Sequence, residues 1–349
     1  MKLSKFEQKI VLFLFLILFF NFNNYLKAQD FSQNNILNNL NTISCETAES
    51  CKIKGDDFFK QQDLENAIQY YNKAISIDSN YFKAYRNIGY AYFLLNQYDN
   101  AISFLIKTIE LNSKEIKPYL YLAQIYIDLR DYDKAIDILD KAKLVEPENP
   151  QIYQNLSLIH SLKYQLNSTA ISNNNSLDLA INYIQKAIVL DSDNSTFYVD
   201  LANLYNLQKN EKKAIDSYNK ALKLDPNNAE AYYRLGMLYE SNQKDQEAIK
   251  VYNSAICCNV DQKEIINVYK KLGELYFKLK QYDKSAEILE KSITITQDDI
   301  DLYSNLGNAY LKLNNNDKAL QYYNEALKLS PDNQFIKMKL SLIKENNNK

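Results

Sequence analysis

The side chains that could do acid–base, nucleophilic or metal chemistry are few in this sequence. His160 is the only histidine, and the four cysteines are Cys45, Cys51, Cys257 and Cys258. Structural zinc sites usually carry CxxC pairs, and none of these spacings fits. The sequence also contains no GxSxG, HExxH or glycine-rich phosphate-binding loop. We therefore expect a protein that is not an enzyme and that uses no cofactor or metal.

The composition is that of a folded chain rich in helix. Its 349 residues exceed what one compact core usually holds, which predicts two domains or an elongated array. With 46% hydrophobic and 24% charged residues, a mostly disordered chain is excluded. Only five Gly and five Pro disfavour turn-rich all-β folds. The net charge of −2 argues against nucleic acid as a partner.

The N-terminus has the pattern of an export signal. Three lysines precede an unbroken apolar run from Ile10 to Phe20, which is shorter than the ~20 residues that span a membrane. Ala28 is a small residue suited to cleavage. We expect residues 1–28 to be a signal peptide and the protein to be exported (periplasmic, secreted or lumenal). The alternative is a retained anchor, and membrane contact is expected only in that case.

Small residues recur with a period of 34 residues. Counting in steps of 34 residues from Ala48 gives eight repeats, with 11 extra residues inside the fourth and three before the seventh. The residues of each repeat are numbered below as places 1 to 34. Place 8 of the repeats holds Gly55, Gly89, Ala123, Ser157, Ala202, Gly236, Gly273 and Gly307. Place 20 holds Ala67, Ala101, Ala135, Ala180, Ala214, Ala248, Ser285 and Ala319. Place 27 holds Ala74, Thr108, Ala142, Ala187, Ala221, Ala255, Ser292 and Ala326.

Each repeat predicts two helices that cross at these small residues. Apolar residues recur in steps of three and four, as in Tyr85, Ile88 and Gly89 of a first helix. Glycine inside a helix costs ~0.5–1 kcal/mol relative to alanine, so its use at place 8 indicates a closely packed second backbone. Prolines at place 32 end a repeat because they cannot continue a helix.

The pattern resembles the tetratricopeptide repeat. That family carries an aromatic residue, a Leu followed by a small residue, and a Tyr in the first helix. The second helix carries Ala, an aromatic residue and Ala, and Pro follows. The eighth repeat matches at every place, with Tyr303, Leu306, Gly307, Tyr310, Ala319, Tyr323, Ala326 and Pro331. The resemblance implies an all-α, right-handed superhelical solenoid of eight helix-turn-helix repeats plus a C-terminal capping helix.

The 34-residue period predicts the boundaries of the segments along the chain. Residues 29–47 form a flexible Asn-rich leader, and residues 334–349 form the capping helix. The fourth repeat holds a polar surface loop at roughly Gln165 to Leu177. The eight repeats are 48–81, 82–115, 116–149, 150–194, 195–228, 229–262, 266–299 and 300–333.

The single histidine, the cysteines and the many tyrosines have structural interpretations in this register. Seventeen of the 29 tyrosines fall at places 4, 11 and 24, so we expect core residues and not a platform for stacking nucleobases. His160 falls at place 11 and is predicted to be an aromatic substitute in the core. Cys257 and Cys258 are predicted to be small buried apolar residues. In an exported chain, Cys45 and Cys51 could form a disulfide.

The resemblance also predicts a binding surface, because the family binds peptides or proteins along its concave groove. The groove is lined by residues of the first helices that do not pack against the second helices. In the first three repeats the candidates are Lys52, Lys83, Arg86, Asn87, Tyr90, Lys117 and Tyr121, with Asp56, Phe93 and Gln124 beside them. This basic and aromatic patch suits an extended peptide with an acidic group.

Two alternatives stay open for the groove. One subgroup of the family clamps the C-terminal carboxylates of chaperones, but Asp56 and Tyr121 depart from its Lys, Asn, Asn, Lys, Arg pattern. A groove in later repeats would use Asn203, Asn206, Arg234, Asn305 and Asn308. The predicted function is a protein–protein interaction scaffold or adaptor. The runner-up is a membrane-anchored structural or assembly factor of the cell envelope.

Overall fold

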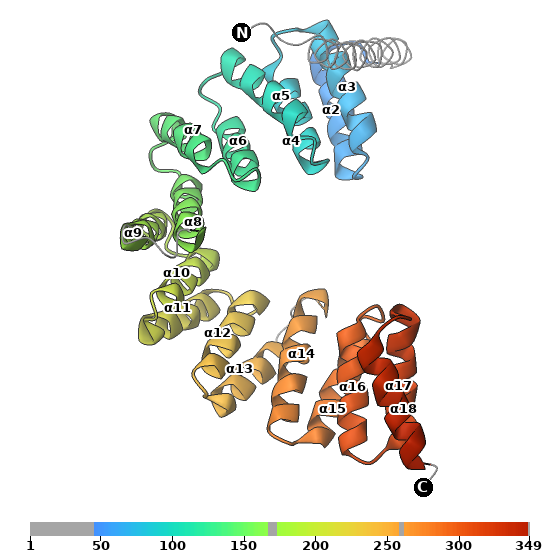
Figure 1. Ribbon diagram of the computed structural model, residues 1–349. Coiled ribbons are helices and arrows are strands. Elements are labelled where there is room, and N and C mark those ends of the chain that lie inside the picture. Colours follow the sequence, from blue (N-terminus) through green and yellow to red (C-terminus); the bar gives the residue numbers. More distant parts are fainter. Residues whose placement is uncertain (1–44, 167–172, 258–261, 348–349) are drawn as a thin grey trace, which may run out of the picture. The chain divides into compact units, whose positions relative to one another are not determined.

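The computed structural model describes residues 45–166, 173–257 and 262–347. Within these ranges the chain forms seventeen α-helices and no strand, which confirms the all-α prediction (Figure 1). The helices are α2 (Ala48–Lys60), α3 (Leu64–Ile77), α4 (Phe82–Leu94), α5 (Tyr98–Leu111), α6 (Lys117–Asp128), α7 (Tyr132–Val145), α8 (Pro150–Leu166), α9 (Asn173–Leu190), α10 (Ser195–Leu207), α11 (Glu211–Leu224), α12 (Ala229–Ser241), α13 (Asp245–Cys257), α14 (Gln262–Lys278), α15 (Tyr282–Ile293), α16 (Ile300–Lys312), α17 (Asn316–Leu329) and α18 (Gln334–Asn347).

The chain divides into two compact parts. We call residues 1–155 the N-terminal block and residues 156–349 the C-terminal block; the division falls inside α8. From α2 to α7 in the N-terminal block, and from α9 to α18 in the C-terminal block, each helix packs on the one that follows it. This is the repetitive stacking of a helical solenoid, in which each pair buries its apolar face against its neighbours.

Helix starts follow the 34-residue period closely. Six of the predicted repeats open on the first residue of a helix, and α6 opens one residue late, at Lys117. The largest departure is α14, which begins at Gln262, so that the three extra residues before the seventh repeat lengthen this helix. The division into eight repeats stays a prediction.

The small residues lie where pairs of helices cross. Every residue at places 20 and 27 of the second helices is completely inaccessible to solvent. At place 8, the glycines face the side chain at place 24 of the second helix, which is Tyr71, Leu105, Tyr252, Leu289 or Tyr323. A Cβ on Gly307 would lie only 2.6 Å from Tyr323 Cε1. The close approach of two helices therefore accounts for these glycines.

The turn between the helices of a pair contains an unexpected feature. Seven residues at place 15 adopt positive φ, and none of them is glycine; the set is Gln62, Asn96, Arg130, Lys209, Gln243, Lys280 and Asn314. A non-glycine residue in the left-handed region costs roughly 1–2 kcal/mol, less for Asn. The same strained turn is thus repeated along the array.

Two local predictions need correction. The insertion of the fourth repeat is not wholly a loop, because α8 continues to Leu166 and α9 starts at Asn173; residues 167–172 lie outside the described residues. Cys257 is exposed and not buried. It lies two residues after the fully buried Ala255, on the other side of α13. Cys258 lies outside the described residues.

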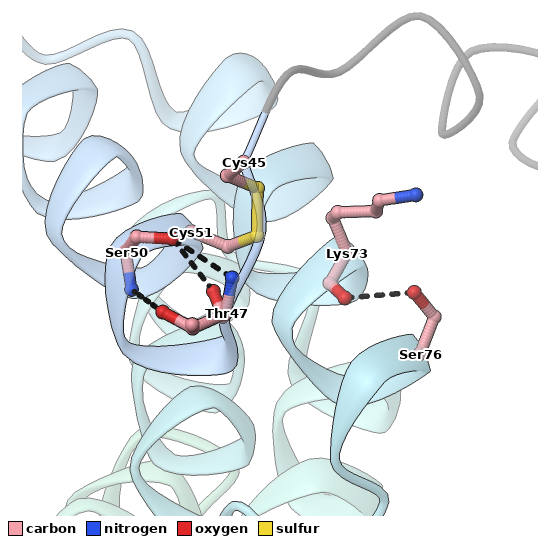
Figure 2. The surroundings of a disulfide bond; sticks show 6 residues. All are labelled: Cys45, Thr47, Ser50, Cys51, Lys73 and Ser76. Atoms are coloured by element: carbon pink, nitrogen blue, oxygen red, sulfur yellow. Dashed lines mark hydrogen bonds between the residues drawn. A yellow bond between two sulfur atoms is a disulfide. The ribbon is translucent and has the colours of Figure 1, made fainter.

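The N-terminal end of the array is fastened by a disulfide (Figure 2). Cys45 and Cys51 are bonded, with their Cα atoms 5.3 Å apart, and Cys51 is completely buried. Between them, Thr47 and Ser50 form a capping box at the start of α2. The predicted signal peptide and most of the leader lie outside the described residues, and no described helix is long and apolar enough to cross a membrane.

The C-terminal end is covered by α18. Ile336, Leu340 and Ile343 are buried in the same apolar cluster as residues of α16 and α17. Next to this apolar face α18 exposes Lys337 and Lys344, at places where earlier first helices contact their own second helix, and its far side exposes Met338 and Leu342.

Candidate functional site

The predicted groove residues lie together on the first helices of the N-terminal block. Lys52 is on α2, Lys83, Arg86, Asn87 and Tyr90 are on α4, and Lys117 and Tyr121 are on α6. We call this set, with Asp56, Phe59, Phe93 and Glu115, the N-terminal face. Because α4 contacts both α2 and α6, the face is continuous across three helices.

A half-buried carboxylate occupies the centre of the N-terminal face. Asp56 Oδ2 lies 2.6 Å from Lys52 Nζ, and Oδ1 accepts hydrogen bonds from the Tyr71 hydroxyl at 2.8 Å and from Asn87 Nδ2 at 3.0 Å. Burial and this hydrogen bond raise the pKa of Tyr71 above its ordinary value of 10.0, so the hydroxyl stays a donor. Three donors thus already hold an internal carboxylate, and a ligand carboxylate would have to displace Asp56.

Arg86 is also held from within the chain. Its Nη1 donates to Glu115 Oε1 at 2.9 Å, while Nε and Nη2 each donate to Asn87 Oδ1 at 3.1 Å. The side chains of Arg86 and Glu115 are 19% and 21% exposed. This guanidinium therefore links α4 to the segment before α6, and most of its hydrogen-bonding capacity is already used.

Aromatic rings connect the three first helices. The Tyr90 ring stacks on Tyr121 with centroids 4.5 Å apart and on Phe59 at 5.5 Å. Phe93 lies 6.4 Å from Tyr121. Burial raises the pKa of Tyr121 above 10.0, so its hydroxyl is neutral at physiological pH. All four rings are partly exposed, and since their faces cover one another, the stack offers mainly ring edges to a ligand.

Two cations of the N-terminal face remain available. Lys83 and Lys117 are exposed, and neither has a partner among the described residues. They occupy place 2 of consecutive repeats, on α4 and α6. In the predicted basic patch, Lys52 and Arg86 thus form ion pairs within the chain, whereas Lys83 and Lys117 have no such partner among the described residues. Sequence reasoning did not anticipate the roles of Glu115 and Phe59.

The alternative asparagines belong to the C-terminal block. The Tyr218 hydroxyl donates to Asn203 Oδ1 at 2.5 Å, and the Tyr323 hydroxyl donates to Asn308 Oδ1 at 2.9 Å. These tyrosines occupy place 24 and the asparagines place 9, as do Tyr71 and Asp56 in the first repeat. Each buried tyrosine therefore orients a polar side chain on the neighbouring first helix.

The ring of the single histidine packs against an aromatic side chain of the neighbouring helix. The His160 ring stacks on Tyr183 with centroids 5.5 Å apart, and its Nδ1 is buried without a hydrogen-bond partner among the described residues. Burial, with a smaller contribution from Lys163, lowers the pKa of His160 below 6.5. In the described part of the chain, no group of three or more His, Cys, Asp or Glu is placed to hold a metal ion.

The geometry defines an array of short helix pairs with an extended polar and aromatic face, and family models agree with it. A model described as "TPR repeat" matches residues 55–96, 205–243 and 273–314. Two models described as "Tetratricopeptide repeat" match residues 300–333 and 96–158. Together these matches cover more than half of the chain. The protein belongs to the tetratricopeptide repeat family.

Several solved structures are similar in fold to parts of this chain. The APC/C hetero-tetramer Cut9–Hcn1 matches with 16% identity and a TM-score of 0.47 over 83% of this chain, which spans only 54% of that one. A MamA structure matches with 22% identity and a TM-score of 0.42, covering 49% of this chain and 94% of MamA. MamA from Desulfovibrio magneticus RS-1 matches with 17% identity and a TM-score of 0.44, covering 52% and 96%. No curated protein matches the sequence.

Proposed function

We propose that the protein is a non-enzymatic interaction scaffold whose N-terminal face binds an extended segment of a partner protein. One observation carries the proposal: Lys83 and Lys117 are exposed and unpaired among the described residues, beside a partly exposed aromatic stack, while the other cations of the face are held internally. Solvated cations next to rigid rings provide both charge attraction and apolar contact area.

The spacing of the two lysines restricts the ligand. First helices that pack side by side are about 8–10 Å apart. An extended chain rises about 3.3 Å per residue. Two acidic side chains about three residues apart would therefore reach Lys83 and Lys117 together, while apolar side chains between them meet the edges of Tyr90 and Tyr121. Asp56 already accepts the hydrogen bonds of Lys52 and Asn87. We therefore do not expect the C-terminal carboxylate of a ligand to be the main group that this face recognises.

We also propose that the protein is exported. The apolar run from Ile10 to Phe20 supports an N-terminal export signal. The bonded pair Cys45 and Cys51 supports an oxidising compartment, since disulfides persist there and are rare in the cytosol. A membrane-anchored assembly factor stays the alternative, and it depends on residues outside the described ones.

Affinity capture from the source cells tests the binding proposal. The bait is the full chain, beside a Lys83→Ala/Lys117→Ala variant. The matched control is Lys107→Ala/Lys141→Ala, which removes two exposed lysines from the second helices α5 and α7 of the same block. Captured proteins are identified by mass spectrometry.

The proposal predicts a partner that the wild type and the control retain and the Lys83/Lys117 variant loses. A partner retained equally by all three baits would move the binding site to another surface. A bait that captures no partner would favour the anchored structural role.

A further inference from the structure

A polar trough runs along the first helices of the C-terminal block. One hollow of about 370 Å³ lies over α14 and α16 and is lined by Lys270, Lys271, Glu274, Asp301 and Asn305. A second hollow of about 510 Å³ lies beside α12 and is lined by residues that include Asp225, Glu230 and Arg234. Tyr233 and Asn267 line both hollows, so the two lie side by side.

Every cation of the trough has its own carboxylate. Lys270 lies 2.7 Å from Asp299, Lys271 lies 2.9 Å from Glu274, and Arg234 lies 3.2 Å from Glu230. After this pairing two carboxylates are left, Asp225 in one hollow and Asp301 in the other. Neither has a cationic partner among the described residues. The trough therefore has an excess of negative charge, whereas the free charges of the N-terminal face, Lys83 and Lys117, are positive.

The trough also offers amides that match a peptide backbone. The side-chain amides of Asn267 and Asn305 make no hydrogen bond within the described part of the chain. Each side-chain amide has one acceptor oxygen and two donor hydrogens, which complement the N–H and C=O of an extended chain. Apart from the Tyr233 ring and Ala229, every lining residue is polar or charged, so bulky apolar anchors find little contact area.

From this charge balance and lining we infer that the trough binds a second, basic extended segment, so that the protein holds acidic and basic sequences on separate faces. The distance from the start of α12 to α16 is about two helix spacings, roughly 20 Å. At about 3.3 Å per residue, basic side chains some six residues apart would meet Asp225 and Asp301. The inference goes beyond the proposed function and does not depend on it.

Fluorescence anisotropy with the full chain tests the inference. The probes are labelled Gly–Ser octapeptides that carry Lys at positions 1 and 7, Glu at positions 1 and 7, or Lys at positions 1 and 2. The variants are Asp301→Asn and Asn305→Ala. The matched control is Asp332→Asn, which removes the same charge from a fully exposed site outside the trough.

We expect the peptide with widely spaced Lys to bind at least tenfold tighter than the Glu peptide and tighter than the peptide with adjacent Lys. Asp301→Asn should weaken it about two- to fivefold, as expected for an exposed ion pair, and Asp332→Asn should not. No detectable binding, equal binding of the Lys and Glu peptides, or equal losses in the two Asp variants would overturn the inference. The Lys83→Ala/Lys117→Ala variant should bind like the wild type, which separates this test from that of the N-terminal face.

Discussion

The packing of Gly307 against Tyr323 leads to a quantitative prediction for a double-mutant cycle. A methyl group at residue 307 would lie 2.6 Å from Cε1 and 2.7 Å from Cδ1 of a ring that is completely buried. The ring has little freedom to move because its hydroxyl is bonded to Asn308. Overpacking of this kind costs about 1–3 kcal/mol, against about 0.5–1 kcal/mol gained in helix propensity. We expect Gly307→Ala to lower the free energy of unfolding by about 1 kcal/mol.

The second variant of the cycle is Tyr323→Leu. Alone it removes ring volume and a hydrogen bond, with an expected cost of about 2–4 kcal/mol. Combined with Gly307→Ala, it replaces the rigid ring by a more flexible side chain that can turn away from the methyl group, as in the third repeat, where Ala123 and Leu139 occupy the same two places and both are completely buried. The double variant should therefore be less destabilised than the sum of the single variants, by about 1–2 kcal/mol.

Urea unfolding of the full chain, followed by far-UV circular dichroism, measures the cycle. Lys83→Ala is the reference for an exposed, unpaired position and should change the free energy of unfolding by less than ~0.5 kcal/mol. Additive effects of the two substitutions, or a stabilising Gly307→Ala, would refute the explanation of the place 8 glycines by close helix packing.

Three further predictions concern the ends, the turns and the histidine. Cys45→Ala should lower the free energy of unfolding by about 2 kcal/mol, from loss of a six-residue loop closure, and urea unfolding of this variant should be insensitive to reductant. Lys209→Gly should raise the urea midpoint slightly, because relief of left-handed strain, ~1 kcal/mol, exceeds the added unfolded-state entropy. His160 has a folded-state pKa below 6.5, so the unfolded state binds the proton more tightly; thermal stability should fall as pH drops from 7 to 5.5, and less so in His160→Phe.

Each of these predictions has a contradicting result. A Cys45→Ala variant as stable as the oxidised wild type would show that the disulfide does not constrain α2. A lower midpoint for Lys209→Gly would mean that the lysine side chain contributes more than its backbone strain costs. An unchanged pH profile in His160→Phe would assign the acid sensitivity to carboxylates.

Much of the fold could be predicted because the repeat places small residues where helices must approach. The small residues at places 8, 20 and 27 are explained by close packing of two helices, and the register follows from them. The strained turns could not be predicted in this way. Lys209 and Arg130 carry no sequence signal for positive φ, since the turn geometry is imposed by the two helices that it joins.

The position of the candidate site could be predicted from the sequence, but the ion pairing of its charged side chains could not. The periodicity placed Arg86 and Lys117 on one face, but it did not show that Arg86 is paired and that Lys117, among the described residues, is not. Arg86 pairs with Glu115, which lies in the turn two residues before α6 and outside the helical periodicity, so its position depends on the three-dimensional path of the chain. The alternative groove in later repeats included Arg234 and Asn305, which line the two hollows, but the sequence did not indicate Asn267, or Asp225 and Asp301, which have no cationic partner in the described ranges.

Side-chain oxidation footprinting tests the central claim, that a partner binds the N-terminal face, most directly. Hydroxyl radicals would label the full chain alone and with the partner captured in the affinity experiment. If the partner binds the N-terminal face, oxidation of Tyr90, Phe93 and Tyr121 falls on binding, while oxidation of Tyr126, which lies under Lys134 of the second helix α7, does not change. Protection of Tyr126 with Tyr90 and Phe93 unaffected would refute binding at the N-terminal face and place the partner on the second helices.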